Sequence, residues 1–138
     1  MLFRSLVITI PVSDAPYLGF QLGSLWYISL DYINHQTSLN NTQAQADPDG
    51  KVRMVVADQN PGVTNWVETL GHRRGYLQFR WQRVSRELTD GDGPTVELVD
   101  LDAVASKLPY FDQNKISEDD WRERIALRHQ QIQARMLG

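Results

Sequence analysis

Alternating apolar and polar positions predict β-structure through the first hundred residues. Leu6, Ile8 and Ile10 alternate with more polar neighbours, and similar runs recur between clusters of Gly, Pro, Asp and Ser, which favour turns. The predicted strands cover residues 6–10, 17–22, 25–30, 51–58, 75–84 and 95–101. Gly23-Ser24 predicts a hairpin between the second and third strands. Residues 31–46 are polar and show no period, which predicts a long loop.

The run at residues 75–84 has the clearest two-residue period. Its odd positions are apolar and predict a core-facing side, whereas its even positions predict a surface of hydrogen-bonding groups. The odd positions are Leu77, Phe79 and Trp81, and the even positions are Tyr76, Gln78, Arg80 and Gln82.

The period changes after residue 101. Residues 102–108 predict a short helix that stops at Pro109, and Ser117 is a good N-cap for a longer helix. An apolar stripe recurs there at helical spacing, at Trp121, Ile125, Leu127 or Arg128, Ile132 and Met136. The stripe could fold back on the sheets or pack against another chain.

These elements predict a mainly β fold, an antiparallel β-sandwich of jelly-roll type with one short helix and a longer C-terminal helix. We expect a single domain over residues 1–138, with strands over about 1–101 and a helical C-terminal extension over 102–138. Self-association through the C-terminal helix and exposed strand edges is one consequence of this arrangement.

Composition excludes several classes of protein. The net charge is −3, which argues against a nucleic-acid partner held by phosphate contacts, and no apolar run is long enough to span a membrane. There are no cysteines, hence no disulfides or thiolate metal sites. The first ten residues lack the features of a signal peptide, so a cytoplasmic location is the default. The start almost directly inside a strand-like run is consistent with a piece of a longer protein.

Candidate chemistry concentrates in residues 65–75, between two apolar runs. Glu68 and His72 are four residues apart and could form an acid–base pair, although Gly71 argues against a helix there. His35 could join only through the fold. One histidine with one carboxylate is too few ligands for zinc, so we expect no metal. The alternative for Glu68 is a surface ion pair with Arg73 or Arg74.

The same segment leads into a candidate ligand-binding face. Trp66 could be an aromatic platform beside the amide of Asn65, but a structural role for both residues is the favoured interpretation. Arg74 lies just before the predicted strand at residues 75–84. Arg80 lies within that strand between Gln78 and Gln82, and an arginine there can bind a carboxylate or phosphate. The strand would form a lined concavity if the facing strand added Tyr27 and Asp31. The candidate ligand-binding residues are Asn65, Trp66, Arg74, Tyr76, Gln78 and Arg80.

Several short motifs together resemble a known family. They are Gly19-Phe20-Gln21-Leu22, Trp26 with Ser29-Leu30-Asp31, Ser38-Leu39-Asn40, Asp49-Gly50, Pro61-Gly62, Asn65-Trp66 and Arg80-Trp81. Over about residues 5–110 the chain resembles the C-terminal domain of the domain-of-unknown-function 1214 family. The resemblance implies a bacterial β-sandwich of jelly-roll type, often preceded by a second β domain, and no established activity. Residues 67–72 depart from the proline-containing stretch of many members.

Three functions remain open on the sequence alone. The first is a soluble, non-enzymatic module that binds a small polar or carbohydrate-like ligand, or a partner domain, without a cofactor. The second is a hydrolase with His72 as general base, Glu68 orienting it, and Arg74 or Arg80 stabilising negative charge. The third is a structural domain that oligomerises through its C-terminal helix.

Overall fold

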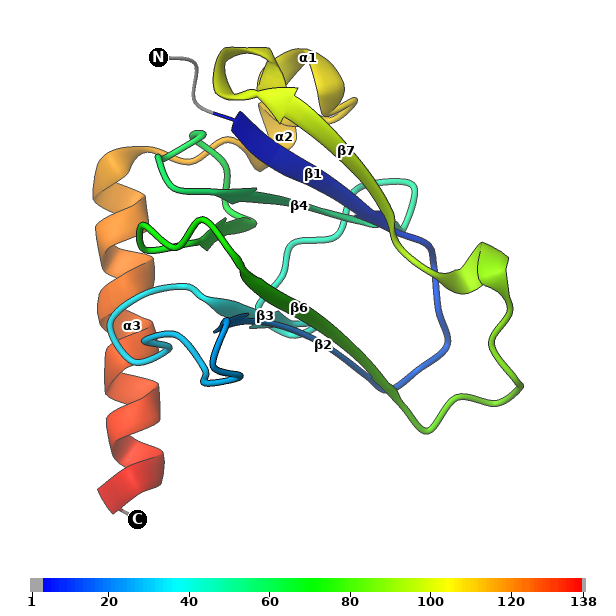
Figure 1. The fold of residues 1–138 in the computed structure, drawn as a ribbon, viewed down its shortest axis with the longest axis horizontal. Helices are drawn as coiled ribbons and strands as arrows, with labels where there is room; N and C mark the ends of the chain where they lie inside the picture. The colour runs from blue at the N-terminus through cyan, green and yellow to red at the C-terminus, as the bar shows by residue number, and fades with distance from the viewer. Residues whose placement is uncertain (1–3, 138) are drawn as a thin grey trace.

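A computed structural model describes residues 4–137, except the side chains of residues 136 and 137. The described chain folds into two β-sheets that face each other, with helices beside and above them (Figure 1). The fold is therefore β-rich with a C-terminal helix, as the sequence predicts. The strands are β1 (Arg4–Ile10), β2 (Tyr17–Ser24), β3 (Ser38–Asn40), β4 (Val52–Ala57), β5 (Trp66–Glu68), β6 (Gly75–Gln82) and β7 (Thr95–Asp100).

One sheet has the order β5-β4-β1-β7, and the other has the order β3-β2-β6. All pairs are antiparallel except β4 with β5, which run parallel. That pair departs from the predicted all-antiparallel arrangement. Its register places Val55 opposite Trp66, so the Asn65-Trp66 motif enters the sheet directly beside β4.

The interior between the sheets is built from the predicted two-residue periods. Ile8 and Ile10 of β1 meet Met54 and Val56 of β4, and β6 contributes Phe79 and Trp81 but not Leu77. Val7 lies on the opposite face of β1, in a second cluster with Trp66 and Trp121. That cluster is covered by helices, so β1 is buried on both faces and its apolar residues do not simply alternate.

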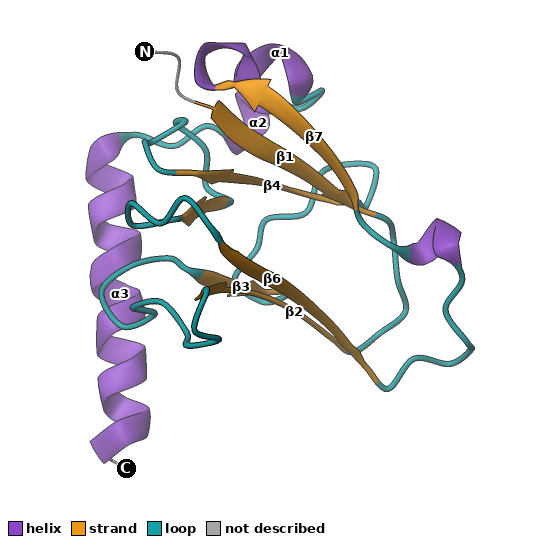
Figure 2. Cartoon of the chain, in the orientation of Figure 1, coloured by secondary structure: helices purple, strands orange, loops and turns teal. Residues whose placement is uncertain are grey.

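The three α-helices follow the strands in sequence. They are among the purple elements of Figure 2. They are α1 (Val104–Lys107), α2 (Phe111–Asn114) and α3 (Glu118–Leu137), with short 3-10 turns at Asp90–Asp92 and Leu101–Ala103. Ser117 caps α3 as expected, because its Oγ accepts a bond from the Asp120 N–H at 3.1 Å. Trp121 and Ile132 are buried against the same chain, so the apolar stripe folds back on the domain. Met136, also assigned to the stripe, has its side chain outside the described part.

Two local predictions are wrong. Residues 25–30 do not form a strand: the Ser24 N–H bonds to the Ile28 carbonyl at 2.8 Å, and Tyr27 has a positive φ of 61°. This compact turn leaves residues 25–28 exposed. In addition, the predicted loop at 31–46 contains β3, and β5 and α2, which have three and four residues, were not predicted.

Candidate functional site

The outer face of the sheet β3-β2-β6 carries two parallel rows of polar residues. The strand register sets Arg80, Gly19 and Asn40 side by side in the first row. The second row contains Gln78, Gln21 and Ser38. The apolar neighbours of these residues point to the opposite face, into the core. The two-residue period of each strand therefore places both rows on the outer face, and we call the two rows together the polar grid.

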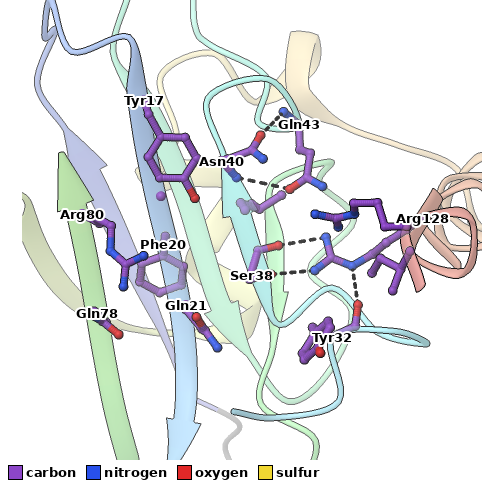
Figure 3. A pocket seen from close by; sticks show the side chains of 14 residues that line it. Tyr17, Phe20, Gln21, Tyr32, Ser38, Asn40, Gln43, Gln78, Arg80 and Arg128 are labelled. Atoms are coloured by element: carbon purple, nitrogen blue, oxygen red, sulfur yellow. Dashed lines mark hydrogen bonds between the residues drawn. The ribbon is translucent and has the colours of Figure 1, made fainter. Parts of the chain in front are cut away.

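Helix α3 forms a wall beside this grid and turns it into a concavity of about 160 Å³ (Figure 3). Arg128, Ile132 and Arg135 line it from the helix, and Arg80 faces Arg128 from the far strand. The lining also contains three hydroxyl side chains and four amides, but no Asp or Glu. The hydroxyl and amide residues are Tyr17, Tyr32, Ser38, Gln21, Asn40, Gln43 and Gln78.

Arg128 is the most constrained group of this concavity. Only 7% of it is exposed, and its guanidinium donates to the Tyr32 carbonyl at 2.9 Å, the Ser38 carbonyl at 3.0 Å and the Ser38 Oγ at 2.6 Å. All of these acceptors are neutral. Burial lowers the pKa of Arg128, and the nearby charges of Arg124 and Arg135 lower it further, while Glu68 partly offsets them. The guanidinium nevertheless stays charged, so an anion in the concavity would be favoured.

The floor of the concavity depends on the close approach of the Tyr17 ring to Gly19. The Tyr17 ring lies over Gly19, where a Cβ atom would be 2.7 Å from the Tyr17 hydroxyl oxygen. Any larger residue at position 19 would push the ring away. Gln21 is held by a hydrogen bond from its Nε2 to the Ser29 Oγ. The polar floor is thus ordered before any ligand arrives, which reduces the entropic cost of binding.

The concavity differs in part from the predicted one. Tyr27 stacks on Tyr76, with ring centroids 4.3 Å apart, and neither residue lines it. Asp31 accepts the backbone N–H groups of Ile33 and Asn34 at 3.0 and 3.1 Å, and these bonds, led by that of Asn34, lower its pKa. Of the candidate ligand-binding residues, the structure brings Gln78 and Arg80 into the concavity.

Asn65 and Trp66 are buried, with 2% and 7% of their surfaces exposed. The Asn65 side chain accepts the Gln45 N–H at 2.8 Å and donates to the carbonyls of Gln45 and Arg53 at 2.7 and 2.9 Å. The Trp66 indole donates to the Ala57 carbonyl at 2.8 Å and packs on Trp121. These contacts support the structural interpretation and leave neither side chain open to a ligand.

The structure does not bring Glu68 and His72 together. After β5 the chain turns at Leu70 and Gly71, which both have positive φ, and the exposed His72 lines a different hollow from Glu68. Glu68 instead lies 3.2 Å from the His35 Nδ1 and accepts the Gln36 N–H at 2.6 Å. The histidine beside Glu68 is therefore His35, which lies 33 residues earlier in the sequence, and not the predicted His72.

Arg74 and Tyr76 line a separate hollow that also contains His72. The predicted site residues thus divide among the concavity, the core and this second hollow. Among residues 4–137, no three His, Asp or Glu side chains are grouped to hold a metal ion. Within the same range, no helix has the length and apolar character needed to cross a membrane.

Sequence reasoning missed the part of the site that α3 supplies. One signal was present: Arg128 occupies a position of the apolar stripe, where a charged residue is out of pattern. Gln21 gave another, because it alternates with Phe20 and Leu22 along β2. Neither signal identifies which elements meet.

The fold has a counterpart among solved structures, whereas no family model and no curated protein matches this chain. The crystal structure of an uncharacterized protein from Burkholderia cenocepacia is similar, with a TM-score of 0.66 and 34% sequence identity. The match covers 72% of this chain and 27% of the Burkholderia chain. The match therefore spans about a quarter of the length of the Burkholderia protein, and the comparison identifies no ligand.

Proposed function

We propose that this domain is a non-enzymatic binding module for a small polar ligand with an acidic group, a sugar acid being the class that fits best. The observation that carries the proposal is the concavity beside α3, which is lined by three arginines and, among residues 4–137, by no Asp or Glu. Arginine binds carboxylate and phosphate through paired hydrogen bonds, which makes it suited to such a ligand.

The surrounding residues supply the contacts that a sugar needs. Gln78 and Gln21 lie side by side in one row, Asn40 lies in the neighbouring row, and each amide can donate to and accept from hydroxyl groups. Tyr17 offers an aromatic ring beside them. Arg80 is exposed on the rim and faces the buried Arg128 across the concavity, so an acidic group between the two would be attracted by both charges.

The test is calorimetric titration with galacturonate, using neutral galactose as the comparison ligand. We expect galacturonate to bind more tightly than galactose, and Arg80→Gln to weaken it about tenfold, the loss of one charged hydrogen-bonding partner. Arg80 is exposed, so the variant should remain folded. Arg122→Gln, on an exposed part of α3, is the matched control. Equal binding of the two sugars, or equal effects of the two variants, would refute the proposal.

We also propose a finer classification of the fold and its setting. The shared core between the two sheets supports a jelly-roll sandwich, and the quoted motifs support membership of the domain-of-unknown-function 1214 family. Similarity to a longer Burkholderia protein supports a bacterial source and a neighbouring domain as partner. Unpaired edges at β3, β6 and β7 support self-association as a further property.

A further inference from the structure

A second hollow lies between the two sheets, where β1 and β4 of one sheet face β2 and β6 of the other, beside the loop that joins β5 to β6. It measures about 400 Å³, within the usual range for small-molecule sites. Its walls are mainly apolar and come from both sheets. The apolar lining residues are Leu6, Leu22, Leu30, Val56, Tyr76 and Leu77.

The mouth of this hollow is cationic. Arg73 and Arg74 line it, and neither forms an ion pair with another residue in the range 4–137. His72 precedes them at the same rim. Asp58 lines an adjoining hollow together with Arg73, and its Oδ1 accepts the Thr69 hydroxyl at 3.0 Å and the Gly71 N–H at 2.5 Å. One oxygen of its carboxylate is therefore already engaged within the loop.

The apolar walls are also incompletely covered. Leu77 is 38% exposed although its strand neighbours on the same face are packed in the core, and Leu98 of β7 in the adjoining hollow is 56% exposed. Covering such surface gains free energy in proportion to the apolar area removed from water. A ligand with an apolar tail would cover these walls, and an acidic head would meet the two arginines at the mouth.

We propose that the hollow between the sheets binds an amphipathic monocarboxylate, an acyl chain with its acid group at Arg73 and Arg74. The site is distinct from the sugar-acid concavity, which lies on the outer face of the β3-β2-β6 sheet. The two sites share no lining residue. An experiment can therefore refute the acyl-chain site without refuting the sugar-acid site, and the reverse.

The test is calorimetric titration with decanoate below its micelle concentration, with decanol as the uncharged comparison. We expect decanoate to bind more tightly than decanol. The double variant Arg73→Gln/Arg74→Gln should weaken decanoate about tenfold, to the level of decanol. Leu77→Gln, a polar substitution in the partly exposed wall, should weaken both ligands. Arg80→Gln should change galacturonate binding and leave decanoate binding as it is.

Three results would overturn the proposal. One is no binding of decanoate by the intact protein, and another is equal decanoate affinity in the double variant and in Arg122→Gln. The third is binding to vesicles that contain phosphatidylglycerol without binding to monomeric decanoate, which would assign the basic mouth to a lipid surface.

Discussion

Replacing Asn65 with alanine tests whether the Asn-Trp motif is structural. The substitution removes three hydrogen bonds, at 2.7, 2.8 and 2.9 Å, that join the loop at Gln45 to β4 at Arg53. A hydrogen bond contributes roughly 1 kcal/mol net, and a buried partner left unpaired costs more. We expect Asn65→Ala to lower the free energy of unfolding by about 3 kcal/mol, a large share of the 5–15 kcal/mol that is typical of a domain.

The assay is urea unfolding followed by tryptophan fluorescence, supported by thermal unfolding, where the loss corresponds to a Tm lower by roughly 10 °C. Asn60→Ala is the matched control. Asn60 is exposed and caps a turn through one bond to the Gly62 N–H at 2.7 Å, so its loss should cost about 1 kcal/mol. If Asn65→Ala loses no more stability than Asn60→Ala, the motif does not tie the loop to the sheet and the structural assignment fails.

Three further predictions concern stability. Trp66→Phe should cost about 2 kcal/mol in urea unfolding, because it removes the indole hydrogen bond to the Ala57 carbonyl and reduces packing on Trp121; an unchanged midpoint would contradict this. Gly75→Ala should cost about 2 kcal/mol, because its Cβ would lie 2.1 Å from the Gly23 carbonyl oxygen, whereas Gly91→Ala, with 3.9 Å to its nearest atom, should be nearly neutral. The Arg86 guanidinium, followed by the Thr89 N–H, lowers the pKa of Asp92 below its usual 3.8. The stabilisation is therefore present above pH 3.8 and is lost as the pH falls toward the folded-state pKa, so Asp92→Asn should destabilise at pH 7 and much less at pH 2; equal losses at both would disprove it.

The long elements were predictable because local pattern determines them. The strand β6 follows from its two-residue period, and α3 follows from its cap and its helical stripe. Strands β3 and β5 were missed because three residues are too few to show a period. Residues 25–30 have strand-like composition, but the turn closed by Ser24 and the positive φ of Tyr27 override it.

The candidate site was predictable only where it lies on one strand. Gln78 and Arg80 follow from the polar face of β6, but Arg128 reaches them from 48 residues further along the chain. The pairing of Glu68 with His35 spans 33 residues and depends on the fold in the same way. Sequence spacing reports neighbours on a helix or strand, and it carries no information about contacts that tertiary packing creates.

Helix α3 therefore serves both the core and the concavity, and this changes how self-association should be tested. Trp121 packs on Trp66 and Arg128 lines the concavity, so deleting residues 117–138 would disturb folding and binding together with any assembly. Leu127 is 54% exposed and is the large apolar residue that the described part of the helix leaves open. Leu127→Glu should lower the mass in analytical ultracentrifugation if α3 joins two copies. Because Trp121 and Ile132 are already buried and Ile125 is partly buried against the same chain, we expect the mass to be unchanged. A clear shift from dimer to monomer would show that α3 is the assembly element after all.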